Sequence, residues 1–128
     1  MKAFLKNYRQ SPRKVRLVAN LVKGKNVGSA IAELDFLVKH AGAPIKKLLL
    51  SAVANAKNQG IEAENLFIKE LRVDKGIIMK RIMPAAMGTA HRINKRTSHV
   101  EVVLAEKVAL VKNSKKAPRA AKVKQGKK

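Results

Sequence analysis

Residues 66–104, LFIKELRVDKGIIMKRIMPAAMGTAHRINKRTSHVEVVL, are the most informative part of this chain for its fold. At their far end Val100, Val102 and Leu104 stand at every second position, as in a half-buried strand. At their near end residues 66–68 and 71–73 are also β-like, and the spacing between them indicates a change of face, as a β-bulge produces. The two ends therefore predict two strands of one sheet.

The segment between these strands, residues 74–99, predicts a β-hairpin whose tip extends away from the sheet. It has no large apolar face of helical period, and the turn residues Pro84 and Gly88 stand at its centre. We expect the hairpin to span about residues 76–99, and eight residues per arm would reach roughly 26 Å at about 3.3 Å per residue. Because a two-stranded ribbon is only marginally stable alone in water, a partner must hold it.

The N-terminal part predicts a short strand at residues 3–9 and then a helix that begins at Ser11-Pro12. Ser is a good N-cap, Pro at the first helical position loses no hydrogen bond, and Gly24 ends the helix. The apolar stripe of this helix is expected to consist of Val15, Val18, Leu21 and Val22.

Two more helices are predicted before residue 60. One runs from about Val27 to Lys39, and the other begins at Gly42-Ala43-Pro44 and stops near residues 58–60. The buried side of the first is expected to consist of Ile31, Leu34, Phe36, Leu37 and Val38. The second has apolar residues at the spacing i, i+3, i+4, i+7, namely Ile45, Leu48, Leu49, Ala52, Val53 and Ala56.

Charge is distributed unevenly along the 128 residues, which carry 29 Lys and Arg, 8 Asp and Glu, and a net charge of +21. Residues 1–27 hold eight basic and no acidic residues, residues 28–74 hold six of each, residues 75–106 hold six basic and two acidic, and residues 107–128 hold nine basic and none acidic. We expect residues 1–106 to form one domain and residues 107–128 a basic disordered tail. Such a charge attracts polyanions.

Catalysis and metal binding are not supported by the residues present. There is no cysteine, and His91 and His99 have no acidic residue between them to complete a metal site with them. No phosphate-cradling glycine loop or nucleophile elbow is found. The longest apolar runs are far too short to span a bilayer, and the N-terminus does not resemble a secretory signal. We therefore predict no enzyme, no cofactor, no metal and no membrane partner.

The scarcity of aromatic residues and the clustering of cations predict how the chain would bind nucleic acid. The chain has three Phe, one Tyr and no Trp, and none of them lies in residues 68–128, which disfavours a sheet that stacks single-stranded bases. Contacts to phosphate, sugar and shape are expected instead, with a folded RNA as the partner. The predicted hairpin carries clustered cations without a compensating acid nearby, namely Lys80, Arg81, Arg92, Lys95 and Arg96.

Four motifs in order resemble one known family: SPRKVRLVANLVKGK at 11–25, SAVANAKNQG at 51–60, MKRIMP at 79–84 and KRTSHVEVVL at 95–104. The chain resembles bacterial-type large-ribosomal-subunit protein twenty-two over nearly all of residues 1–106. The resemblance implies an α/β fold in which three helices pack on a small antiparallel sheet with a long protruding hairpin. It also implies binding to large-subunit ribosomal RNA, help in early assembly, and a hairpin that lines the nascent-peptide exit tunnel close to where macrolide antibiotics bind.

The resemblance also assigns residues to roles and names partners. Its expected RNA-binding residues are Arg13, Lys14, Arg16, Lys80, Arg81, Arg92, Lys95, Arg96, Thr97, Ser98 and His99. Its expected tunnel-lining residues are Met79, Pro84, Ala85, Ala86, Met87, Gly88, Thr89, Ala90 and His91. The partners are large-subunit ribosomal RNA, neighbouring large-subunit ribosomal proteins and the nascent peptide, in a cytoplasmic ribosome or an organellar one. The chain departs from the family at Ala85, Met87 and Thr89, where members are usually basic, so a less cationic tunnel wall is expected.

The net charge of +21 has two other interpretations. A free-standing basic protein that compacts nucleic acid is the alternative function, and it should bind duplex DNA and ribosomal RNA about equally at physiological salt. A membrane-active cationic peptide is disfavoured, because no predicted helix combines a basic face with an aromatic-rich apolar one.

Overall fold

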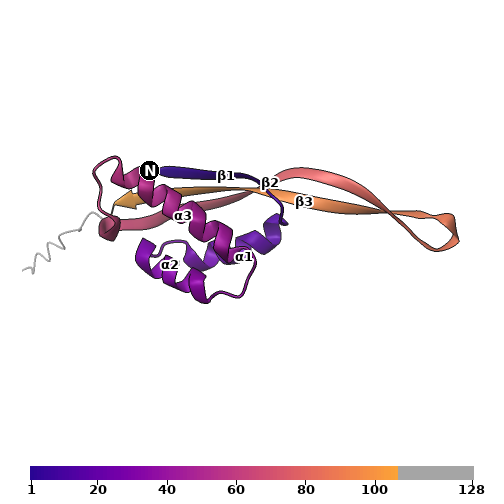
Figure 1. The fold of residues 1–128 in the computed structure, drawn as a ribbon, viewed down its shortest axis with the longest axis horizontal. Helices are drawn as coiled ribbons and strands as arrows, with labels where there is room; N and C mark the ends of the chain where they lie inside the picture. The colour runs from indigo at the N-terminus through magenta and orange to yellow at the C-terminus, as the bar shows by residue number, and fades with distance from the viewer. Residues whose placement is uncertain (107–128) are drawn as a thin grey trace, which may run out of the picture.

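The computed structural model describes residues 1–106, so the expected basic tail at residues 107–128 lies outside the described residues. Three helices cover one face of a three-stranded antiparallel sheet, and a long hairpin projects from the sheet (Figure 1). The strands are β1 (Lys2–Tyr8), β2 (Leu66–Pro84) and β3 (Ala90–Glu106), and the helices are α1 (Pro12–Val22), α2 (Val27–Phe36) and α3 (Gly42–Lys57). The predicted α/β architecture is confirmed.

Strand β3 is the centre of the sheet, because it pairs with β1 on one side and β2 on the other. The predicted alternation in β3 is confirmed: Val100, Val102 and Leu104 are buried against the helices, while the residues between them are only half-buried. Since paired residues point to the same face, the partners Ala3 and Val73 are buried with them.

Strand β2 changes its facing residues at a bulge, as its spacing predicts. Leu66 and Ile68 face the helices before the register shift between Ile68 and Glu70, and Leu71 and Val73 face them after it. One extra residue moves the inward positions from even to odd numbers. The bulge lets both apolar groups of β2 enter one core.

Helix α1 begins and ends close to the predicted residues. Pro12 is its first residue, and Gly24 follows its end with a φ of +79°, a left-handed conformation that glycine adopts without strain. The carbonyl of Ser11 accepts from the amides of Lys14 and Val15 at 3.0 and 3.2 Å, but its side chain makes no capping hydrogen bond. Leu21 is 41% exposed, so its expected place in the buried stripe is wrong.

Helix α2 ends at Phe36, earlier than the predicted Lys39. Its buried residues are Val27, Ala30 and Leu34, which follow helical spacing. Phe36 stands two positions after Leu34 and therefore points away from the core, so it is 87% exposed. Val38 is 99% exposed in the extended segment that follows, and the burial expected for these two side chains is wrong.

Helix α3 supplies the centre of the core. Ile45, Leu49, Ala52 and Ala56 are fully buried, and Leu48 and Val53 nearly so, which confirms the predicted face. Beyond this core, β2 and β3 continue along the long axis of the molecule as the hairpin (Figure 1).

Candidate nucleic-acid interface

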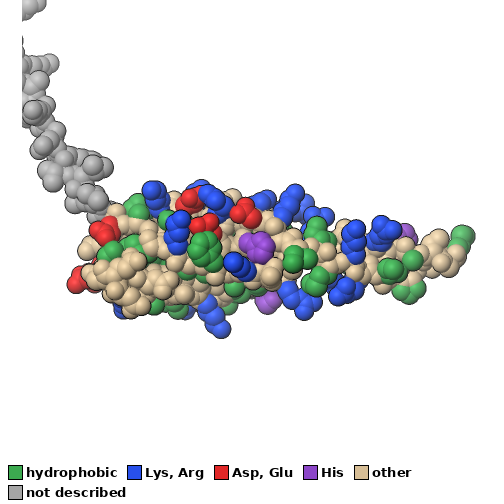
Figure 2. All heavy atoms as spheres, turned by 90° about the horizontal axis from the view of Figure 1, so that it is seen from above, with side chains coloured by type: hydrophobic (Ala, Val, Ile, Leu, Met, Phe, Trp, Pro, Cys, Tyr) green, Lys and Arg blue, Asp and Glu red, His purple; other side chains and the backbone are tan. Residues whose placement is uncertain are grey.

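Acidic side chains gather at the helical end of the molecule, and cations continue along the hairpin. Figure 2 shows this separation on one face, with red side chains over the sheet and helices and blue ones reaching toward the tip. Four of the acids at that end form ion pairs, namely Lys25–Glu33, Lys46–Asp35, Arg72–Glu70, Arg72–Glu101 and Lys2–Glu101. Within residues 1–106, no ion pair reaches a hairpin cation.

The hairpin presents cations on both of its faces. Its register pairs Ile78 with Arg96, Lys80 with Asn94, and Ile82 with Arg92, which share one face. The intervening pairs are on the other face: Met79 with Lys95, Arg81 with Ile93, and Met83 with His91. Because each face carries at least two Lys or Arg side chains, a polyanion could contact the hairpin from both sides.

The tip carries no Lys or Arg between Met83 and His91. The chain turns through the 3-10 helix η2 (Ala86–Gly88), and the amide of Ala85 donates to the carbonyl of Thr89 at 2.9 Å. Met87 has a φ of +58° and is fully exposed. Of the nine expected tunnel-lining residues, Met79 and Ala85 are half-buried and the others are exposed. Thus the tip is a neutral, accessible surface.

Two residues that the resemblance assigns to RNA lie at the base of the hairpin. Thr97 and Ser98 are buried, and Thr97 Oγ1 donates to the carbonyl of Ile77 at 2.7 Å. Thr97 is 5% exposed and Ser98 is fully buried, so an RNA contact by their side chains stays a prediction. A Cβ on Gly76 would collide with Thr97 Oγ1 and lie 3.2 Å from the Thr97 carbonyl carbon, so the close approach of the two strands requires glycine.

His99 joins the hairpin base to β1. Its Nδ1 accepts from the amide of Asn7 at 3.1 Å, and Asn7 has a φ of +56° within the register shift of β1. Tyr8, the next residue, donates its hydroxyl to the carbonyl of His40 at 3.3 Å, and burial raises the pKa of this hydroxyl. His99 is half-buried, so one edge of the ring is used internally.

Helix α1 contributes cations of two kinds. Arg16 donates through Nε and Nη2 to the carbonyl of Val73, at 3.1 and 2.8 Å, and so ties α1 to β2. Arg13 and Lys14 are exposed on the same helix and make no ion pair within the described residues. The sequence places all three on α1 but cannot tell that Arg16 is already engaged.

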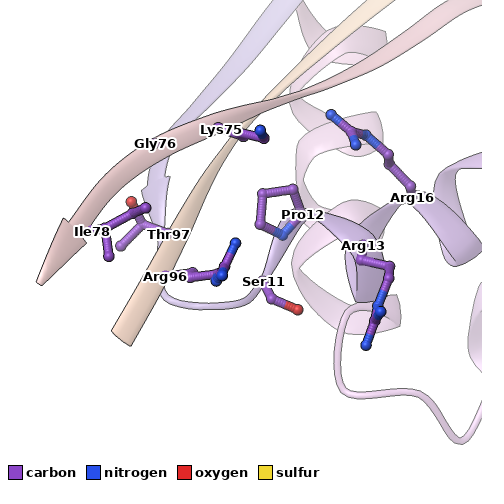
Figure 3. Close-up of a pocket in the computed structure, with 9 residues that line it drawn as sticks. All are labelled: Ser11, Pro12, Arg13, Arg16, Lys75, Gly76, Ile78, Arg96 and Thr97. Atoms are coloured by element: carbon purple, nitrogen blue, oxygen red, sulfur yellow. The ribbon is translucent and has the colours of Figure 1, made fainter. Parts of the chain in front are cut away.

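Tertiary structure creates a pocket of about 300 Å³ between the start of α1 and the hairpin base. Figure 3 shows Lys75 and Arg96 reaching from the strands toward Pro12, and Arg16 reaching toward β2. Its main lining side chains are Pro12, Arg13, Arg16, Lys75, Ile78 and Arg96. Lys75 and Ile78 were missed by sequence reasoning, since no local pattern connects them to residues about sixty positions earlier.

A second hollow of about 450 Å³ adjoins this pocket, and Ser11 and Arg96 line both. It adds the cations Arg9, Lys14 and Lys95. In the described part of the chain, no group of three His, Cys, Asp or Glu could hold a metal ion, and no helix is long and apolar enough to cross a membrane. The Lys and Arg side chains that line the two hollows can therefore bind an anion.

Comparison with known proteins identifies relatives across this whole region. The family model described as ribosomal protein L22p/L17e matches residues 3–105. A protein of Desulfitobacterium hafniense named large ribosomal subunit protein uL22 is 51% identical over 107 residues, which are 83% of this chain and 94% of the relative. Proteins of the same name from Oceanobacillus iheyensis and Acholeplasma laidlawii are each 50% identical over 107 residues, covering 83% of this chain and 95% and 96% of theirs.

Proposed function

Because this chain belongs to the family of ribosomal proteins L22p/L17e and is a structural constituent of the large ribosomal subunit, we propose that it binds large-subunit ribosomal RNA through α1 and its hairpin. The family is one of structural proteins rather than enzymes. The relatives come from bacteria, which fits the expected place in a cytoplasmic ribosome. Ribosomal RNA and neighbouring ribosomal proteins are its partners in that assembly.

The observation that carries the proposal is the contrast in pairing between cations. Within residues 1–106, the cations that form ion pairs all belong to the body, namely Lys2, Lys25, Lys46 and Arg72, and none belongs to the hairpin. The hairpin cations stand on both faces of a ribbon that buries no side chain between Ile77 and Arg96. An isolated ribbon is marginal in water, so a polyanion around it would supply both the missing contacts and the missing charge.

Salt dependence of RNA binding tests this assignment. Log affinity should fall with log salt by about 0.7–0.9 for each phosphate neutralised, so Lys80→Gln should reduce the slope by just under one unit. Lys46→Gln is the matched control, because Lys46 already has a carboxylate partner, and it should leave the slope nearly unchanged. Equal slopes for the two variants would contradict a hairpin contact with phosphate.

The second part of the proposal concerns the hairpin tip. We infer that Met79, Pro84 and residues 85–91 line the nascent-peptide exit tunnel, in line with the family resemblance. The exposed and uncharged surface around Met87 supports this, since a passing chain of any sequence would meet neither charge attraction nor charge repulsion there. Assembly of the subunit relies on the cationic arms, and the tip is left free for the peptide.

Site-specific photo-crosslinking on ribosomes with a stalled nascent chain tests the tip. A photoreactive side chain at Met87 should crosslink to the nascent peptide. The same group at Phe36, which is 87% exposed but belongs to the helical end, should not. Crosslinks from Met87 to RNA alone would overturn the tunnel assignment.

The alternative, a free-standing protein that compacts nucleic acid, makes a different prediction. It would bind duplex DNA as tightly as ribosomal RNA and would be absent from purified large subunits. Electron microscopy of intact ribosomes, with density fitted by the hairpin and helices, separates the two readings.

A further inference from the structure

The pocket between α1 and the hairpin base combines an apolar floor with a cationic rim. Pro12 is buried beneath it, and Ile78 is 44% exposed beside it. Lys75, Arg96 and Arg16 surround this floor (Figure 3). Among the described residues, no acidic side chain lines either this pocket or the adjoining hollow.

A second register shift in β2 creates the floor. Val73 and Lys75 pair with Val100 and Ser98 and share the helix-facing side of the sheet. Regular alternation would place Ile77 next on this side, but the shift between Lys75 and Ile78 pairs Ile78 with Arg96 instead. Ile77 is consequently left 66% exposed outside the pocket.

The chemistry of the pocket is specific to a ligand with two unlike parts. A phosphate alone would need the cations but not the apolar floor, and an apolar side chain of a protein would gain nothing from Lys75 and Arg96. A nucleotide has flat apolar faces and an anionic phosphate on each side. A planar guanidinium such as that of Arg96 can stack on a base, and unstacked bases of RNA bulges are recognised in this way. A volume of about 300 Å³ lies at the small end of ligand pockets.

We propose that this pocket receives one unpaired nucleotide extruded from a bulge in folded RNA. The base lies against Pro12 and Ile78 beneath Arg96, and the flanking phosphates lie along Arg9, Lys14 and Lys95 in the adjoining hollow. The inference rests on the proposed RNA-binding function and adds a base contact to it. It also changes the expectation drawn from the scarcity of aromatic residues, because proline, isoleucine and arginine can receive a single base without them.

Binding of three RNA stems to the full chain tests the proposal. The stems are identical except for a single bulged adenosine, an abasic residue at the same bulge, or no bulge. At one salt concentration near the physiological value, the adenosine bulge should bind about tenfold more tightly than the other two, which is the size of effect expected for one stacked base.

Matched variants assign that preference to the pocket. Ile78→Thr and Arg96→Ala should each abolish it. Ile82→Thr and Arg92→Ala should keep the preference, because Ile82 and Arg92 form the equivalent cross-strand pair on the same face, four residues nearer the tip. Loss of a phosphate contact in Arg92→Ala should weaken binding of all three stems equally. All four side chains are exposed enough to be changed without altering the core, and circular dichroism checks that the fold is retained.

The outcomes separate this inference from the function on which it rests. Equal binding of the adenosine and abasic bulges would overturn the base contact while leaving RNA binding intact. Competition by free adenosine monophosphate at the concentration of the RNA would show a mononucleotide site and would also overturn it. Failure to bind any of the three stems would instead count against the proposed function itself.

Discussion

The body of the protein and its hairpin share the strands β2 and β3 but are stabilised in opposite ways. Val73 pairs with Val100 in the body, and both are buried; Ile82 pairs with Arg92 in the hairpin, and both are exposed. In residues 1–106, every buried apolar side chain lies at or before Val73 or at or after Val100. The body is therefore held by burial of its own surface, whereas the hairpin depends on a partner for its order.

The change from buried to exposed strand pairs occurs within a few residues. Beyond this point the helices no longer cover the sheet, and the two-stranded ribbon continues alone. The point is marked by Gly76, Thr97 and the second register shift of β2. Four experiments test this difference between the body and the hairpin.

Hydrogen exchange should show the largest difference. Amides of β2 and β3 beside Val73 and Val100 should exchange only with opening free energies close to the global stability, of order 5–15 kcal/mol for a small domain. Amides of residues 80–95 should exchange through local opening at a small fraction of that. Strong protection of residues 80–95 in the absence of RNA would show that the hairpin stabilises itself.

Cavity-creating substitutions should separate the regions next. Leu49→Ala removes a fully buried side chain and should lower the free energy of unfolding by about 2–5 kcal/mol. Ile82→Ala, at a side chain that is 72% exposed, should change it by less than about 0.5 kcal/mol. Urea denaturation measures both, and a comparable loss for the two would mean that the hairpin packs as part of the core.

Gly76→Ala tests the junction itself. The new methyl group would collide with Thr97 Oγ1, which is held by its hydrogen bond to Ile77, so we expect a loss of about 1–3 kcal/mol in unfolding free energy. Gly28→Ala is the matched control: nothing lies within 4 Å of the added Cβ and the residue is helical, so a gain of about 0.5–1 kcal/mol is expected. Equal responses would remove the steric argument for glycine at position 76.

The smallest effect distinguishes two arginines of α1. Arg16→Ala removes both donors to the carbonyl of Val73 and should cost about 1 kcal/mol of stability. Arg13→Ala removes no such hydrogen bond and should weaken RNA binding without lowering stability. Thermal unfolding and RNA titration of both variants would reveal this difference, and an unchanged midpoint for Arg16→Ala would show that its contact to β2 is not stabilising.

Much of the fold could be predicted because it depends on local spacing. The alternation in β3, the face of α3, the start of α1 at Pro12 and the first bulge of β2 are properties of neighbouring residues. The misplaced residues have a tertiary cause. Phe36 and Val38 are apolar but find no packing partner within residues 1–106. Thr97 and Ser98 are polar but are buried in the central strand β3, where Ser98 pairs with both Tyr8 and Lys75.

The candidate site could be predicted in outline only. Clustered cations without acids identify the hairpin and α1 as surfaces for a polyanion from the sequence alone. The partner of Arg16 and the position of Ile78 in the pocket could not be predicted from the sequence, because each depends on a residue about sixty positions away.

Residue types at short spacing were enough to predict the elements, the buried faces of α3 and β3, the excess of charge and the family. The three-dimensional arrangement was needed to show which cations of residues 1–106 lack an acidic partner, which side of the ribbon each residue occupies, and that a pocket forms between α1 and Ile78. The physical reason is register: a single extra residue in β2 reverses every following side chain, and the strand pairing that sets the register joins distant parts of the chain.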